Sequence, residues 1–262
     1  MDNSENYKKD DVKKLLVLAT LAGRIMLKNG AETYRVEDTV IRLCKSRKNI
    51  KYVDAFVIPT GIFISLEYKG ALITYIKRIK SISINLNKID KVNEFSRSFV
   101  NSNMSIEQGL EELKRINKII TYPQLTKSIS GSLASAFFCI LFGGSLLDFI
   151  GSFLVSFLVL ITLDKLSKLE LTFFINNFAG AILASGLSYI VMKIGLGESL
   201  DKVIIGSIMC LVPGVAITNA IRDTMSGDYI SGLSRGMEAV FSAIAIALGV
   251  GIVLNFYLKG VI

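Results

Sequence analysis

The chain has 262 residues, 51% of them hydrophobic, and a formal net charge of +8. The charge is uneven, because residues 1–127 hold 23 Lys and Arg and 14 Asp and Glu, whereas residues 128–262 hold 7 and 8. This split excludes a single soluble globule and predicts a cytoplasmic domain at 1–127 followed by a membrane domain at 128–262.

The composition also excludes several kinds of site. There is no histidine, so the commonest metal ligand and the side chain best suited to proton transfer near neutral pH are missing. The three cysteines, Cys44, Cys139 and Cys210, offer neither a disulfide framework nor paired metal spacing. No nucleic-acid recognition motif accompanies the basic charge. We therefore expect no enzyme activity, metal, cofactor or nucleic acid, and the polar residues 1–11 do not form a signal peptide.

The cytoplasmic domain is predicted to be a small α+β module. Apolar residues at helical spacing indicate two helices, one from residue 11 to about 30 and one that turns Val36, Val40 and Leu43 inward. Three strands follow at 52–58, 62–68 and 72–77 as an antiparallel meander with glycine-containing turns. Two more helices are expected at 88–100 and 106–120, the second opened by a capping box of Ser105 and Gln108.

The segment 30–38 is charged along the outer part of the second helix. One interpretation is a solvated face with ion pairs three and four residues apart. The other is a docking face for a partner or for cytoplasmic loops. The spacing alone leaves both open.

Five apolar stretches follow, and we expect each to cross the membrane as a helix. They cover residues 128–147, 149–163, 171–192, 203–221 and 239–258. The predicted fold is therefore an α-helical membrane protein with five transmembrane helices, preceded by the small α+β cytoplasmic domain. With the basic domain inside, the inner loops hold Lys165, Lys168, Arg222 and Arg235, and the outer ends hold Lys193, Lys202 and Lys259. An odd number of crossings then places the N-terminus in the cytoplasm and the C-terminus outside.

Small residues spaced by four predict helix-packing seams, since they let membrane helices approach closely. The seams are Asn176, Gly180, Ala184 and Ser188; Gly206, Cys210, Gly214 and Thr218; and Ala239, Ala243, Ala247 and Gly251.

The fourth stretch contains Pro213-Gly214 near its middle. Proline removes a backbone donor and clashes with the preceding turn, while glycine lets the chain bend. A discontinuous membrane helix can bind a charged solute, because the half-helix that begins near Val215 presents its amides to an anionic group. A simple proline kink without a ligand is the alternative.

A dense polar run bridges the fourth and fifth stretches: Asn219, Arg222, Asp223, Asp228, Arg235 and Glu238. Arg222 suits a substrate carboxylate, and the acidic side chains suit proton exchange or pairing with the arginines. The alternative is an inner loop whose ion pairs hold two helix ends together.

Two groups of residues resemble the threonine/serine exporter (ThrE-like) family. The first comprises Val212-Pro213-Gly214, residues 219–223, Gly227-Asp228, Ser231-Gly232 and 235–239; the second comprises residues 30–33, Arg35, Glu37, 54–56 and Thr60-Gly61. The resemblance covers nearly the whole chain. It implies a proton-driven exporter of small amino acids or related organic acids in the bacterial inner membrane. The solute-binding or coupling residues are then expected to be Pro213, Gly214, Thr218, Asn219, Arg222, Asp223, Asp228, Arg235, Glu238 and Asn176.

The chain departs from the family pattern in one respect. Full-length members contain two membrane halves, whereas this sequence has one, so the resemblance implies a second small membrane subunit that runs inverted, as in inverted-repeat transporters. A homo-oligomer formed through the seam at 239–251 is the competing assembly.

Three other functions compete with amino-acid export. One is export of a dicarboxylate such as succinate, and another is a non-transporting membrane sensor or scaffold. The third is a hydrolase, because Gly232-Leu233-Ser234-Arg235-Gly236 matches a nucleophile-elbow pattern. A serine triad requires a histidine, which the chain lacks.

Overall fold

The computed structural model describes residues 9–47, 50–80, 82–120, 122–167, 169 and 172–259, so that Lys168 lies outside the described residues. Close contacts divide the chain into two units. The first comprises residues 1–121 and 217–236, and the second comprises 122–216 and 237–262. The first unit therefore includes a segment, 217–236, that the sequence analysis placed in the membrane domain.

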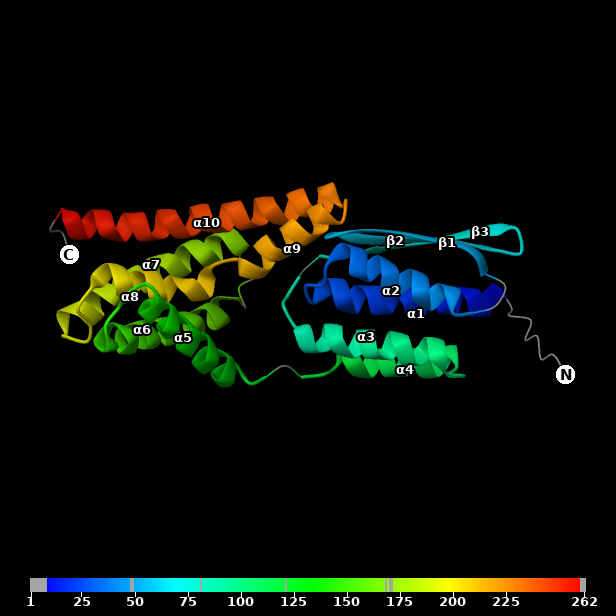
Figure 1. Cartoon of the computed structure of the whole chain (residues 1–262), viewed down its shortest axis with the longest axis horizontal. Helices are drawn as coiled ribbons and strands as arrows, with labels where there is room; N and C mark the ends of the chain where they lie inside the picture. The colour runs from blue at the N-terminus through cyan, green and yellow to red at the C-terminus, as the bar shows by residue number, and fades with distance from the viewer. Residues whose placement is uncertain are drawn as a thin grey trace. The chain divides into compact units, whose positions relative to one another are not determined.

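The first unit begins with two helices, continues with a three-stranded sheet and returns to two helices (Figure 1). The elements are α1 (Lys9–Lys28), α2 (Thr33–Lys45), β1 (Ile50–Ile58), β2 (Gly61–Tyr68), β3 (Ala71–Arg78), α3 (Leu86–Asn101) and α4 (Ile106–Asn117). The strands pair antiparallel in the order β1-β2-β3. The predicted meander and the capping box of Ser105 and Gln108 are confirmed.

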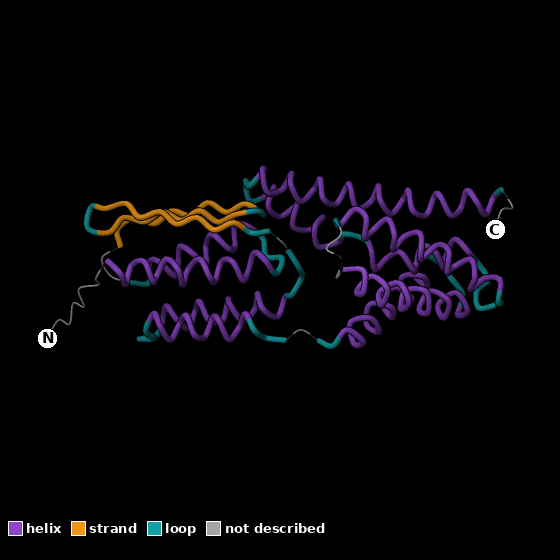
Figure 2. The backbone as a smooth tube through the Cα atoms, turned by 180° about the vertical axis from the view of Figure 1, so that it is seen from behind, coloured by secondary structure: helices purple, strands orange, loops and turns teal. Residues whose placement is uncertain are grey.

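The first unit has three layers, which are the sheet, the pair α1–α2 and the pair α3–α4. Figure 2 shows helices on one side of the sheet, and α1 and α2 contact both the sheet and the pair α3–α4. Alternation along β2 turns Ile62, Ile64 and Leu66 into the core, where each is fully buried. Gly23 of α1 lies so close to Val40 and Ile62 that a methyl group there would contact both, so glycine lets α1 pack directly on α2 and the sheet.

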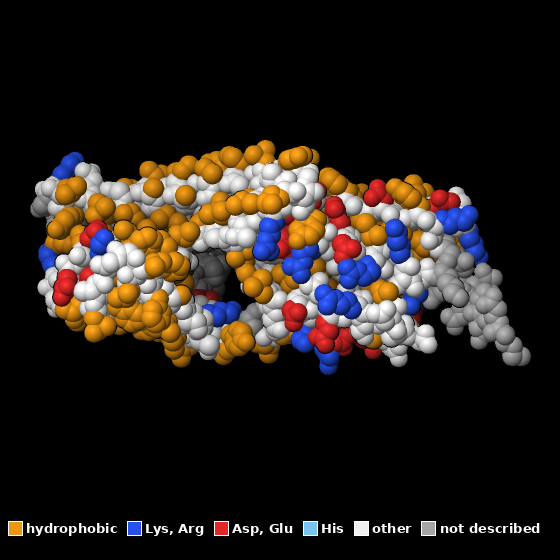
Figure 3. Space-filling model, viewed as in Figure 1, with side chains coloured by type: hydrophobic (Ala, Val, Ile, Leu, Met, Phe, Trp, Pro, Cys, Tyr) orange, Lys and Arg blue, Asp and Glu red, His pale blue; other side chains and the backbone are white. Residues whose placement is uncertain are grey.

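The second unit is helical. Its elements are α5 (Gln124–Leu141), α6 (Leu146–Ser167), α7 (Phe173–Lys193), α8 (Leu200–Ile208) and the short 3-10 helix η1 (Met209–Leu211). Two further helices, α9 (Gly214–Met225) and α10 (Tyr229–Leu258), contribute residues to both units. On the face shown in Figure 3, hydrophobic side chains gather over the helices of this unit, as expected of a surface in contact with lipid.

Five transmembrane helices are not confirmed. Among the described residues, α6, α7 and α10 are long and apolar enough to cross a membrane, and the bent pair formed by residues 200–211 and α9 brings the number to four at most. The helix α5, which occupies the first predicted stretch, falls short because its first half carries Gln124, Lys127 and several serines. What stands is a mostly helical membrane protein with a small three-stranded sheet.

The predicted break at Pro213 is present. The helix preceding it ends at Leu211, α9 begins at Gly214, and the two segments are bent by 56°. Val212 is extended, as expected for the residue before a proline.

Candidate functional site

The turn between α1 and α2 is the first component of the site. Gly30 has a φ of +92°, and the Ala31 N–H donates to the Met26 carbonyl at 3.1 Å, which closes the end of α1 in a left-handed turn. The next helix begins at Thr33, but its N-cap residue, Glu32, provides no side-chain cap. Several backbone groups of the turn 30–33 are therefore directed at partners from elsewhere in the chain.

The second component is the hairpin 217–236, formed by most of α9 and the start of α10. Gly227 closes it with a φ of +90°, and the Asp228 N–H donates to the Asp223 carbonyl at 2.9 Å. Gly232 lies against α9, where a methyl group would meet Thr224 Oγ1 and the Ala220 carbonyl. A side chain at 232 would thus separate the two arms of the hairpin.

Besides the bond from Arg222 to Glu32, four hydrogen bonds join the hairpin 217–236 to the turn 30–33. Asn219 Nδ2 donates to the Gly30 carbonyl at 2.9 Å, and Arg235 Nη2 donates to the Ala31 carbonyl at 2.8 Å. The Thr33 N–H donates to Asp223 Oδ1 at 3.0 Å, and Thr33 Oγ1 lies 3.2 Å from Asp228 Oδ2. Asp223 thus caps α2 from about 190 positions away along the chain, in the place that the N-cap side chain leaves open.

Ion pairs reinforce this docking. Arg222 Nη1 lies 2.5 Å from Glu32 Oε1, and Arg35 Nη1 lies 3.2 Å from the other oxygen of the same carboxylate. Arg235 Nε lies 3.0 Å from Asp223 Oδ2, a charge contact without hydrogen-bond alignment. The side chains of Asp223, Glu32 and Arg235 are almost fully buried, whereas that of Arg222 is about half exposed. We refer to Glu32, Thr33, Asn219, Arg222, Asp223, Asp228 and Arg235 as the polar cluster.

Two glutamates beside the hairpin have opposite pKa shifts. Burial raises the pKa of Glu32, but hydrogen bonds from its own N–H and from Arg222, with the charges of Arg35 and Arg222, outweigh burial and lower the pKa below its ordinary value. Burial also raises the pKa of Glu37, and the hydrogen bond from the Val57 N–H does not compensate for it. The carboxylates of Asp228, Asp54 and Asp223 add to the rise. Glu37, beside the cluster, thus binds a proton more readily than an ordinary glutamate does.

The structure brings together five of the ten residues expected at the site. Asn219, Arg222, Asp223, Asp228 and Arg235 all join the polar cluster. The other five lie elsewhere: Pro213 and Gly214 at the break, Thr218 on the exposed side of α9, Glu238 exposed on α10, and Asn176 in the first turn of α7.

The contacts of the cluster are of two kinds. That of Arg235 with Asp223 joins α10 to α9, as the ion-pair alternative for the polar run expects, while the remaining contacts dock the hairpin on the segment 30–33. Glu32 and Thr33 were not among the ten predicted site residues, although the segment 30–38 that contains them was offered as a docking face. The signal that could have found them was present, since the resemblance rests on residues 30–33 together with 219–223 and 235–239.

Arg222 is the group in the cluster that an external anion can reach. Its guanidinium binds Glu32 but stays about half exposed, so a solute carboxylate can compete for it. By contrast, the Arg235 side chain is about 6% exposed and is enclosed by chain contacts.

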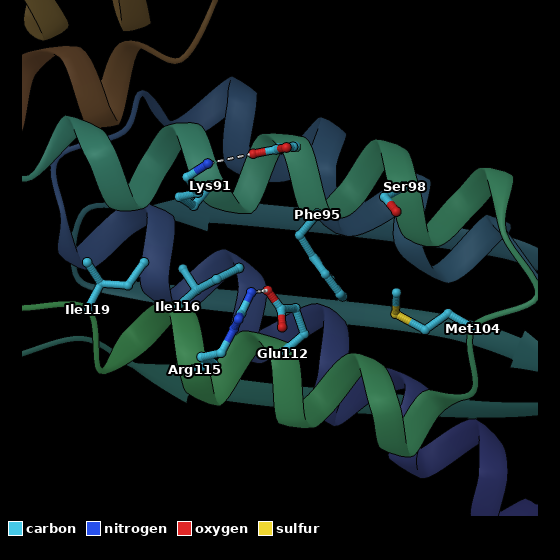
Figure 4. Close-up of a pocket in the computed structure, with 9 residues that line it drawn as sticks. Lys91, Phe95, Ser98, Met104, Glu112, Arg115, Ile116 and Ile119 are labelled. Atoms are coloured by element: carbon cyan, nitrogen blue, oxygen red, sulfur yellow. Dashed lines mark hydrogen bonds and ion pairs between the residues drawn. The ribbon is translucent and has the colours of Figure 1, made fainter.

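A second concave surface lies between α3 and α4 (Figure 4). Phe95, Met104 and Ile116 line it, with ion pairs of Lys91 with Glu94 and of Arg115 with Glu112 at its edge. Each pair joins residues three apart on one helix and is well exposed, so the cations are already neutralised. The polar cluster is the better candidate site.

The nucleophile-elbow pattern is not in an elbow. Ser234 is exposed within α10, and the pattern lies inside one continuous helix instead of a turn from strand to helix. The local structure that a hydrolase needs is therefore not formed at this serine.

Comparisons with known proteins agree with a transport role. Residues 17–257 match the ThrE family model, described as "Putative threonine/serine exporter". The chain is 23% identical over 246 residues to the "Probable succinate transporter subunit YjjP" of Escherichia coli (strain K12), across 93% of this chain and 94% of the relative. It is 22% identical over 236 residues to the protein of the same name from Klebsiella aerogenes, across 90% of each. No solved structure matches the chain.

Proposed function

The chain belongs to the threonine/serine exporter (ThrE) family, and from this premise we propose that it is one subunit of a proton-driven secondary exporter in the bacterial inner membrane. The solutes we propose are small amino acids of the threonine and serine type. Moving one charge through 100 mV supplies about 2.3 kcal/mol, or roughly a fifty-fold concentration ratio, which suffices to expel a metabolite in excess.

The break between η1 and α9 is the observation that carries this proposal. A span bent by 56° at Val212–Gly214 is the kind of discontinuity at which transporters bind charged solutes. The start of α9 provides the positive end of a helix dipole for a carboxylate. Further along α9, Arg222 offers a guanidinium that is about half exposed.

A dicarboxylate is the second candidate solute. The two relatives that align with at least nine tenths of the chain are both named as subunits of a probable succinate transporter. Threonine and succinate share a carboxylate, a group that either the start of α9 or, separately, Arg222 can bind in this proposal.

We also propose that the exporter needs a second membrane subunit. The word subunit in the names of both relatives supports it. A companion that runs inverted would place a second broken helix opposite α9. The N-terminus is proposed to face the cytoplasm and the C-terminus the outside, with α5 as a fifth crossing, since its 18 residues span about 27 Å as a helix.

A counterflow assay tests the proposed function. The full chain is reconstituted into vesicles with and without the proposed second membrane subunit, and uptake of labelled solute is measured against an internal excess of threonine, serine, succinate or a neutral sugar. We expect counterflow with the amino acids, or with succinate if the second candidate holds, and only when both subunits are present. Failure with every carboxylate, in both preparations, would contradict export.

A further inference from the structure

Eight buried serines of the second unit fall into two classes. In the first class the hydroxyl donates to the carbonyl four residues earlier: Ser132, Ser156, Ser185 and Ser188. In the second class the hydroxyl oxygen is buried without a hydrogen-bond partner in the described part of the chain: Ser128, Ser135, Ser152 and Ser207. Burying an unpartnered hydroxyl among apolar helices costs free energy, so the second class requires an explanation.

All four hydroxyls come from helices that touch: Ser128 and Ser135 are on α5, Ser152 is on α6 and Ser207 is on α8. Contacts join α5, α6 and α8 in all three pairings. At Gly206 of α8, a methyl group would lie 2.5 Å from Ser152 Oγ and 2.6 Å from Cys139 Cβ, so glycine lets α8 lie directly against both α6 and α5. Ser207 follows Gly206, and Ser135 precedes Cys139 by one helical turn, on the same face of α5.

The hydroxyls of Ser135, Ser152 and Ser207 also lie at one depth. The Asp148 carboxylate accepts from the N–H groups of Glu198 and Ser199 at 2.7 and 2.9 Å, which fixes the start of α8 beside the start of α6. The helix α5 ends at the same place, just before the turn into α6 (Figure 1). From that end, Ser135 and Ser152 are six residues along their helices and Ser207 is seven. At 1.5 Å per residue, all three lie about 9–10 Å from that end of their helices, whereas Ser128 lies about 20 Å from it.

This serine layer is electrically neutral. Of the buried polar residues described in the second unit, Asp148 alone is charged, and backbone N–H groups bind both of its oxygens. The Cys210 thiol lies beside Ser135, but sulfur is a weak hydrogen-bonding partner. Each hydroxyl can donate one hydrogen bond and accept two, so three together can donate to one carboxylate.

We propose that Ser135, Ser152 and Ser207 form a further binding site for the carboxylate of the transported solute within the second unit, separate from the start of α9 and from Arg222, an inference that rests on the proposed function. Neutral donors hold an anion weakly enough for release, as a transport route requires. Because Gly206 closes α8 onto the layer, the solute enters when α8 shifts. The break at Val212–Gly214, five residues beyond Ser207, gives α8 that freedom.

Alanine substitutions in the two serine classes test this site. The full chain and its partner subunit are reconstituted, and KM and maximal rate of counterflow are measured with labelled threonine and succinate for Ser135→Ala, Ser152→Ala and Ser207→Ala. The controls are Ser132→Ala and Ser156→Ala, whose hydroxyls bind their own helices. Melting temperature is recorded for every variant.

We expect the three layer variants to raise KM at least five-fold while melting at the same temperature as the wild type or higher, since each loses an unpartnered hydroxyl. The controls should keep KM within two-fold. If wild type transports and all five variants share its KM, the serine layer is not the site, although the proposed function stands. If wild type transports none of the carboxylates, the proposed function fails and the site fails with it.

Discussion

At the scale of single residues, the stability of the docked hairpin 217–236 depends on which charged side chains pair. Glu32 is almost fully buried and is approached by both Arg222 and Arg35. A buried carboxylate is stable only while cations or N–H groups surround it, so Arg222 stabilises the docked hairpin.

Arg222→Ala is therefore expected to destabilise the protein. In this variant Glu32 keeps its contact with Arg35 but loses the shorter contact with Arg222. Because Arg222 is about half exposed, we expect the free energy of unfolding to fall by only about 1–2 kcal/mol. Arg42→Ala is the matched control, because Arg42 pairs with Asp38 on the surface of α2, and its loss should cost at most about 0.5 kcal/mol. Unfolding of both variants in detergent checks this, and equal shifts would show that the Arg222 contact stabilises no more than a surface pair.

Glu37 gives the stability a dependence on pH. Its folded-state pKa lies above the ordinary value of 4.5, so its favourable contribution is complete below that value and is lost as pH rises through the folded pKa. Glu37→Gln removes this loss. We expect the variant to melt higher than wild type at pH 8, with a difference that shrinks towards zero near pH 4. A constant difference at every pH would contradict the assignment.

At the scale of elements, the tight crossing of α9 and α10 holds the polar cluster together. Gly232→Ala would place a methyl group against Thr224 and the Ala220 carbonyl, which is backbone and cannot yield. We expect Gly232→Ala to lower the free energy of unfolding by about 1–3 kcal/mol, measured by thermal unfolding. Gly236→Ala, one turn further along α10, meets nothing closer than 4.0 Å and should be neutral or slightly stabilising. Similar destabilisation by both changes would show that the crossing is not the cause.

Elements were predictable where local pattern decides them. The period of apolar residues marked α1 and α2, glycine turns separated the strands, and Pro213 marked the break in the fourth stretch. The number of membrane spans was harder to predict from the sequence. The stretch 128–147 contains several serines and a glycine turn at 143–144, so its helix ends at Leu141. Apolar run length alone therefore does not decide whether α5 crosses the membrane.

At the scale of the whole molecule, the sequence could not reveal which distant segments meet. Thr33 and Asp223 are 190 positions apart, and no local period links a helix start to a carboxylate so far along the chain. The resemblance named both segments without indicating that they touch. It is this contact that turns a list of polar residues on a predicted inner loop into a docked hairpin with one reachable arginine, Arg222.

Efflux from preloaded vesicles tests the central claim most directly. Vesicles that contain the chain and its partner subunit are loaded with labelled threonine or succinate, and release is followed after an imposed proton gradient. We predict gradient-dependent release by wild type and by Arg42→Ala, and its loss in Arg222→Ala and Asp223→Asn variants that still insert into the membrane. Undiminished proton-coupled release by both of these variants would contradict the role proposed for the polar cluster.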